Sequence, residues 1–145
     1  MYRQILITVL LACCAALTHA DQKQVFGDYE VHYSVLNATF LPAEIASRYG
    51  IVRGKDRAIV NIAVRRRLPG GETEAQAAVV TGKSSDLVHS IPLSFEEIRE
   101  SGAIYYLAGL RISDKEPRSF EIKVQPDPAI APYTLKFTKT LYHEE

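Results

Sequence analysis

Short stretches in which apolar and polar residues alternate recur along the chain, and they constrain its fold more than any other feature. Neighbouring positions of a β-strand point to opposite faces of a sheet, so alternation is typical of strands with one buried face. The stretches are residues 26–35, 57–66, 75–80, 87–93, 103–112, 120–124 and a last one from 133. We therefore expect an all-β chain that forms a single-domain immunoglobulin-like β-sandwich of about seven strands, with a small barrel as the alternative.

Residues 42–50 depart from this alternation and predict a short helix that connects two strands. Leu41, Ile45 and Tyr49 are four residues apart, which places one apolar face along about two helical turns. Pro42 suits the first position of a helix and Gly50 suits the residue after its end.

Three further local features carry expectations. Ser94 and Glu97 match a capping box and Gly102 suits a helix end, so residues 95–101 are expected to form helical turns. Residues 82–86 are expected to turn between strands. Lys139 falls on the apolar face of the last strand, so this strand is expected to fray, bulge or reach the rim of the sheet there.

The first twenty residues are typical of a secretory signal peptide. Arg3 precedes a mostly apolar run over residues 5–17, and small residues follow at Thr18 and Ala20. The run is shorter than the roughly 20 residues that span a bilayer. We expect cleavage near Ala20, a periplasmic or secreted mature domain (residues 21–145), and no transmembrane segment in it. Because residues 10–13 have the shape of a lipobox, the alternative is a lipoprotein anchored at Cys13.

Composition excludes several functions for such a mature domain. Both cysteines, Cys13 and Cys14, lie in the expected signal peptide, which leaves no disulfide and no thiol nucleophile. The whole chain has 17 basic and 17 acidic residues, and the balance stays close to neutral without Arg3, so charge gives no reason to expect nucleic acid as a partner. Residues 65–67 are three consecutive arginines, but neighbours on a strand cannot share a face, and we interpret them as a solvated strand end.

No pattern of catalytic or metal-binding residues stands out. His32, His89 and His143 are isolated in sequence, so we expect no metal and no cofactor. A Gly-x-Ser-x-Gly motif is absent. The acidic pairs at 96–97 and 144–145 are explained by helix capping and by a solvated tail. We therefore expect a protein that is not an enzyme.

The candidate site is the segment between the predicted helix and the next strand. Its ligand- or partner-binding residues are Arg48, Tyr49, Arg53 and Asn61. Asn61 is polar within an apolar strand, and a buried amide needs partners. One interpretation is that Asn61 hydrogen-bonds the connecting backbone near Asn37 or Tyr49 and fixes the connection. The other is a polar pocket in which Arg48 or Arg53 receives an anionic group.

Four segments together resemble the DUF4426 family of small secreted or periplasmic bacterial proteins. They are residues 29–34, 40–46, 49–53 and 57–61, and the resemblance extends over nearly the whole mature chain. It implies an extracytoplasmic location and one β-rich domain, and it supplies no catalytic residues.

These observations favour a non-enzymatic binding or protein-interaction module whose partner is a periplasmic protein or a small anionic ligand. One alternative is a structural or assembly accessory that pairs an edge strand with a partner. Another is an unrecognised hydrolase.

Overall fold

The computed structural model describes residues 22–145, so the expected signal peptide and its cleavage site lie outside the described residues. The elements are β1 (Gln22–Phe26), β2 (Tyr29–Asn37), η2 (Ala38–Phe40), α2 (Ala43–Arg48), β3 (Arg57–Arg67), β4 (Thr73–Ala75), β5 (Val79–Ser85), β6 (Ser90–Leu93), β7 (Glu96–Glu100), β8 (Ala103–Arg111), β9 (Glu116–Gln125) and β10 (Tyr133–Leu141).

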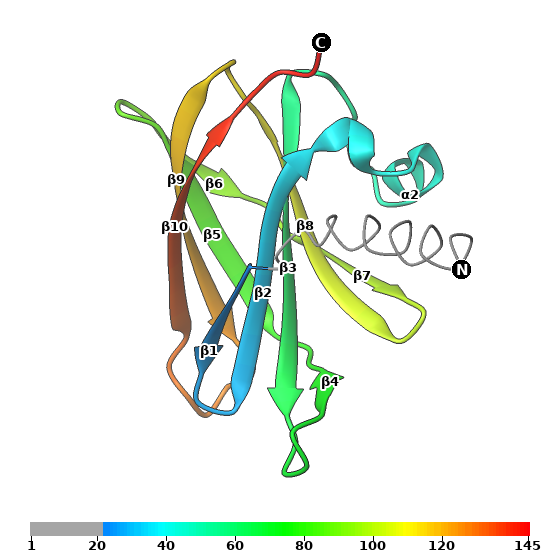
Figure 1. Cartoon of the computed structure of the whole chain (residues 1–145), viewed down its shortest axis with the longest axis vertical. Helices are drawn as coiled ribbons and strands as arrows, with labels where there is room; N and C mark the ends of the chain where they lie inside the picture. The colour runs from blue at the N-terminus through cyan, green and yellow to red at the C-terminus, as the bar shows by residue number, and fades with distance from the viewer. Residues whose placement is uncertain (1–21) are drawn as a thin grey trace, which may run out of the picture.

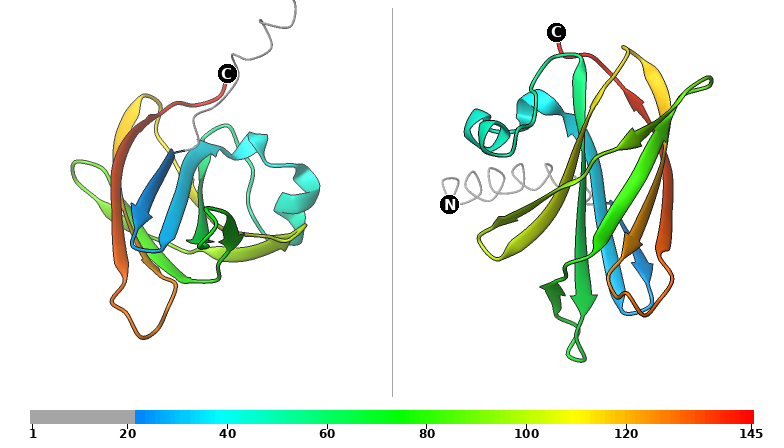
Figure 2. Two further views of the ribbon diagram at one scale, coloured as in Figure 1. Left: turned by 60° about the horizontal axis from the view of Figure 1, so that its bottom comes forward. Right: turned by 180° about the vertical axis from the view of Figure 1, so that it is seen from behind.

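Two antiparallel sheets pack face to face (Figures 1 and 2). The six-stranded sheet has the order β1-β2-β3-β8-β7, with β4 beside the end of β3. The four-stranded sheet has the order β10-β9-β5-β6. The prediction of an all-β sandwich is confirmed and the barrel alternative is wrong. The strand count was too low, since the described residues form ten strands rather than about seven.

The main core fills the space between the sheets. It contains alternate residues of the strands that the sequence pattern had indicated, among them Val60, Ile62, Ile122, Val124 and Leu135, all fully buried. The phase predicted for β10 is confirmed, because Leu135 is buried and its neighbours Thr134 and Lys136 are exposed. Within residues 22–145, no helix has the length and hydropathy needed to cross a membrane.

A second, smaller core lies on the outer face of the six-stranded sheet, under the segment that joins β2 to β3. This segment, residues 38–56, is called the crossover below, and Figure 1 shows its helix α2 standing off the sheet. Ile59, Ile98 and Leu107 of the sheet pack there with Leu41 and other residues of the crossover. The predicted helix is confirmed as α2, and Gly50 follows it with a φ of 67°.

Two of the predicted turns and strands were misplaced. Residues 26–35 form a hairpin rather than one strand, because the chain reverses at Gly27, whose φ is 57°. Gly82 lies inside β5 instead of in a turn. There its missing side chain leaves room for the neighbouring strand, since a Cβ would come within 2.7 Å of Ile122 Cδ1.

The helical turns predicted for residues 95–101 are wrong, because these residues form β7. Ile98 pairs with Tyr105 of β8 and is buried in the second core. Ser101 and Gly102 join the strands with φ values of 50° and 79°, which is the backbone of a two-residue hairpin turn. Pairing with β8 and burial of Ile98 therefore outweigh the local capping signal.

Lys139 joins the two sheets, and β10 neither frays nor bulges there. Its Nζ donates to the carbonyl oxygen of Val35 in β2 across 2.6 Å. β1 pairs with β2 only as far as Tyr33, so this carbonyl lies beyond the end of the neighbouring strand. Among the described residues no strand pairs with β2 on this side at Val35, and the lysine side chain supplies a hydrogen-bond donor there instead.

Candidate functional site

The outer face of the six-stranded sheet is only partly covered by the crossover, and a groove opens beside the covered part. Its walls come from β2, β3 and β8, and it has a volume of about 250 Å³. We call this cavity the outer groove. Among its lining residues are His32, Ser34, Asn61, Ala63, Arg65 and Tyr105. The small Ala63 side chain lies between these larger polar groups along β3, which leaves the face hollow.

Asn61 is the polar residue that the sequence pattern singled out, and it lines this groove. It sits in the middle of β3, opposite Ser34 on one side and Leu107 on the other. Its Oδ1 is the buried side-chain oxygen or nitrogen that lacks a hydrogen-bond partner among residues 22–145. The predicted bond from Asn61 to the crossover is therefore wrong, and Asn37 instead donates to the carbonyl oxygen of Tyr142.

A charged group of three side chains lies at the edge of the groove. His32 Nε2 donates to Glu30 Oε2 across 3.1 Å, and Lys23 Nζ lies 3.3 Å from Glu30 Oε1. Burial works to raise the pKa of Glu30, but the hydrogen bonds from His32 and Lys23 outweigh it and hold this pKa below its ordinary value of 4.5. The carboxylate is therefore ionised at neutral pH and anchors the imidazole of His32.

This pKa predicts how stability depends on pH. Because the folded-state pKa of Glu30 is lowered, its stabilising effect is present above the unfolded-state pKa and is lost as pH falls through the folded value. We expect wild type to be more stable than Glu30→Gln at neutral pH, with the difference shrinking below about pH 4.5. Urea denaturation from neutral pH to about pH 3 measures this.

Glu74→Gln is the control for that series, because Glu74 is exposed on the short strand β4. It should leave the free energy of unfolding within about 0.5 kcal/mol of wild type at each pH. A wild-type advantage over Glu30→Gln that stays constant down to acidic pH would contradict the role of the Glu30 charge.

The structure does not bring the four predicted site residues into one pocket. Arg48 and Tyr49 both donate to Glu100 Oε1, at 3.0 and 3.2 Å. Arg53 donates to the carbonyl oxygen of Thr39, 2.9 Å away, within the crossover. Asn61 lies in the outer groove, which none of the other three lines. The crossover is thus stabilised by Arg48, Tyr49 and Arg53.

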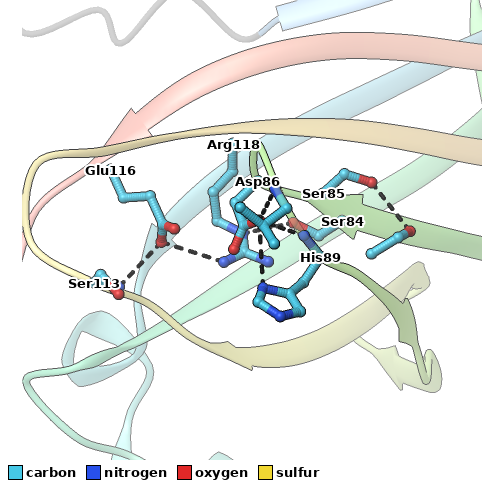
Figure 3. Close-up of polar contacts among 9 residues, drawn as sticks. Ser84, Ser85, Asp86, His89, Ser113, Glu116 and Arg118 are labelled. Carbon is cyan, nitrogen blue, oxygen red and sulfur yellow. Dashed lines mark hydrogen bonds and ion pairs between the residues drawn. The ribbon is translucent and has the colours of Figure 1, made fainter.

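Sequence reasoning missed a buried polar cluster at one end of the sandwich (Figure 3). Arg118 is 6% exposed; its Nε donates to Ser84 Oγ across 2.8 Å and its Nη1 lies 3.2 Å from Glu116 Oε2. In the adjacent hairpin, backbone N–H groups of His89 and Val88 donate to Asp86 and lower its pKa. Arg118 was missed because the strand that became β9 was expected to begin only at residue 120.

The outer groove is lined by an imidazole and a hydroxyl, and an acid lies beside it, but the spacing of the three groups does not suit hydrolysis. Glu30, His32 and Ser34 occupy alternate positions of β2, about 6.6 Å apart along the strand. The long Glu30 side chain can bridge that distance to His32, whereas the short serine side chain cannot. A serine nucleophile needs direct contact with its base. These three residues therefore do not form the direct hydroxyl–imidazole contact of a serine nucleophile.

Metal ligands do not gather in the described part of the chain. Within residues 22–145, no three His, Cys, Asp or Glu side chains are grouped in a way that could hold a metal ion. His143 Nε2 donates instead to the carbonyl oxygen of Ile112, 2.9 Å away, and His89 lies in an exposed hairpin.

The fold is similar to those of three solved structures of bacterial proteins. A DUF4426 family protein from Pseudomonas aeruginosa PAO1 is 37% identical, with a TM-score of 0.77 over 88% of this chain and 99% of that one. FetP from uropathogenic Escherichia coli strain F11 is 11% identical, with a TM-score of 0.65 over 87% and 96% of the two chains. A copper-bound FetP variant is 9% identical, with a TM-score of 0.60 over 87% and 92%.

At such low identity the two FetP structures share the fold alone. No curated protein matches the chain. The family model described as "Domain of unknown function (DUF4426)" matches residues 23–144. This match spans nearly all of the described residues, and the Pseudomonas relative extends it with a solved structure. The chain therefore belongs to the DUF4426 family.

Proposed function

We propose that the protein is a non-enzymatic periplasmic binding module, whose outer groove receives a small ligand that donates a hydrogen bond to Asn61. The observation that carries the proposal is the buried Oδ1 of Asn61, which has no partner although the side chain lines a cavity. An unsatisfied buried acceptor costs about 1–3 kcal/mol. Because this atom is buried, the amide must turn to present Oδ1 to the groove, and a ligand N–H or O–H would then recover that free energy on binding.

The surroundings of Asn61 support a small ligand with a flat or apolar part. The ring of Tyr105 is 37% exposed at the groove, where it offers a surface for stacking. Ser34 lies opposite Asn61 and adds a hydroxyl that can donate or accept. The ionised carboxylate of Glu30 lies beside His32, and its negative charge disfavours an anionic ligand at that end of the groove.

The location in the periplasm belongs to the proposal. It is supported by the signal-peptide pattern of residues 1–20 and by the absence of cysteine from residues 21–145. Cleavage near Ala20 would leave β1 at the start of the mature chain, because β1 begins at Gln22. Mass spectrometry of the mature protein distinguishes this product from one with a lipid on Cys13.

The alternative function, pairing of an edge strand with a partner, is disfavoured by the edges themselves. β6 has four residues, including Pro92, which lacks a backbone donor. Four of the five residues of β7 are charged, which opposes addition of another strand. On the opposite side, Phe26 stacks on Tyr133 at 5.0 Å and Lys139 joins the sheets, so β1 and β10 cover each other.

The copper-bound FetP variant suggests metal binding as another function for a protein with this fold. The described residues of this chain offer no group of three suitable side chains, and we assign no metal to the outer groove.

We expect Asn61→Val to raise the free energy of unfolding by about 1–2 kcal/mol. Valine removes the unsatisfied acceptor and adds a β-branched side chain to a central strand, next to the apolar Leu107. Urea denaturation measures the change. Asn61→Ala is the matched control, because it removes the acceptor without adding apolar contacts. Loss of stability in both variants would show that the Asn61 amide has partners in solution.

The binding role is tested by NMR titration of the isotope-labelled protein with small amides, amines and phenols. A ligand of the groove should shift backbone amides of residues 32–34, 61–65 and 103–105, and Asn61→Val should weaken its binding about tenfold or more. A probe set that shifts none of these resonances, or binds Asn61→Val as tightly as wild type, would overturn the proposal.

A further inference from the structure

A second cavity, also of about 250 Å³, lies between the crossover and strands β7 and β8. We call it the side cavity. Its lining includes residues 49–52 of the crossover together with Arg57, Ser94, Glu96, Leu107 and Gly109. It shares no lining residue with the outer groove. The volume corresponds to about eight water molecules, so the cavity suits a small molecule.

Arg57 is a half-buried cation in this cavity that has no hydrogen bond or ion pair from its side chain within residues 22–145. The other shielded arginines are satisfied: Arg65 donates to Thr73, and Arg118 to Ser84 and Glu116. The cross-strand neighbour of Arg57 is Arg111, whose own charge is paired with Asp56. The guanidinium of Arg57 is therefore the group in the side cavity that an anion would satisfy.

Gly109 is a second feature of the side cavity that the fold does not require. It lies within β8, opposite Ile59, with no positive φ, and a Cβ built on it would meet nothing within 4 Å. Glycine weakens a strand interior, and where neither a turn nor a close neighbour demands it, it often marks a place that a ligand approaches. At this position it leaves the floor of the cavity open.

The remaining walls define the chemistry of the ligand. Ile51 and Leu107 belong to the second core and present apolar surface, while the exposed hydroxyl of Ser94 can donate to an oxygen. Glu96 places a carboxylate at the same cavity, which disfavours a multiply charged anion such as phosphate. These residues together favour a ligand with one negative charge and a compact apolar carbon skeleton.

We propose that the side cavity binds a small organic monocarboxylate, with the carboxylate on the guanidinium of Arg57 and the carbon skeleton over Gly109 and Leu107. Arginine suits this role because its planar guanidinium can donate two parallel hydrogen bonds to a carboxylate. The site is independent of the outer groove and of the function proposed for it.

The test is an NMR titration of the full mature chain with 4-methylpentanoate and, in parallel, with the uncharged amide of the same acid. The carboxylate should shift backbone amides of residues 50–52, 57 and 107–109 saturably, with the millimolar affinity expected of so small a ligand. The amide should bind about tenfold more weakly or worse. Equal affinities, or shifts that do not saturate, would overturn the proposal.

Three variants separate specific recognition from general attraction of anions. Arg57→Gln should weaken carboxylate binding about tenfold or more, and Gly109→Val should abolish it by filling the floor. Arg66→Gln, which removes an exposed arginine from the far end of the same strand, should change nothing. Equal losses in Arg57→Gln and Arg66→Gln would overturn the assignment. Because the outer groove is observed at residues 32–34 and 61–65, failure of one site is distinguishable from failure of the other.

Discussion

Replacing Arg118 with alanine is expected to lower the free energy of unfolding by about 3–4 kcal/mol. Arg118 projects inward from β9 and is 6% exposed, with Ser84, which is fully buried, and the carboxylate of Glu116 as its partners (Figure 3). Alanine would leave a cavity, a buried hydroxyl without its donor and a partly buried carboxylate without its cation. Each of these effects destabilises the folded state, and urea denaturation at neutral pH measures their sum.

Arg111→Ala is the matched control for Arg118→Ala. Arg111 also carries an ion pair, at 3.3 Å to Asp56, but its side chain is 73% exposed. Exposed ion pairs contribute between about 0 and 1 kcal/mol, so Arg111→Ala should change stability by less than that. A similar loss of stability in Arg118→Ala and Arg111→Ala would mean that burial does not determine how much Arg118 contributes to the free energy of unfolding. Arg118→Lys should fall between them, because an ammonium cannot reproduce the two directed bonds of the guanidinium.

The local sequence pattern was sufficient to predict most strands, because one face of each is buried against the opposite sheet. β3, β9 and β10 alternate in phase with the main core, and that alternation is written in consecutive residues. The helix of the crossover was predictable for a different reason that is equally local. Pro42 and Gly50 bound α2 through their own backbone preferences, which need no distant partner.

Residues 95–101 were predicted to be helical because the glycine that follows them, Gly102, suits two different structures. A positive φ is needed both at the end of a helix and in a two-residue hairpin turn, and Gly102 suits either. Only the pairing of Ile98 with Tyr105, and the burial of Ile98 beside Ile59, decide for the strand. The contact between Ile98 and Ile59 joins segments that lie far apart in the sequence, so local pattern does not reveal it.

The candidate site was predictable in part. Asn61 stood out as a polar residue in an apolar strand, and it does line a cavity. Its neighbours Ser34 and Tyr105 come from other strands, so the groove around it depends on sheet order, which local pattern leaves open. The same limit applies to the arginines near the crossover. Which of them is left unpaired depends on Glu100 and Thr39, which lie apart from them in sequence.

Gly82→Ala is expected to lower the free energy of unfolding by about 2–3 kcal/mol. Gly82 pairs with Ile122 of β9 on one side and with Leu93 of β6 on the other. An added Cβ would lie 2.7 Å from Ile122 Cδ1 and 2.8 Å from the carbonyl oxygen of Glu121. The isoleucine side chain can rotate away, but the carbonyl is fixed by the sheet, so β5 and β9 must separate locally. Thermal and urea denaturation both measure the loss.

Gly109→Ala provides a matched control for the steric argument, because Gly109 also lies inside a strand of the sandwich. Its Cβ would meet nothing within 4 Å, so the substitution should be neutral or should stabilise the protein by up to about 1 kcal/mol. The two variants add the same atom to the same kind of backbone and differ in what surrounds it. Equal destabilisation by Gly82→Ala and Gly109→Ala would mean that replacing any glycine within a strand has this effect, and it would contradict the steric argument. A loss confined to Gly82→Ala would show that this glycine sets how closely β5 and β9 approach, and hence how β5 holds Ser84 against Arg118.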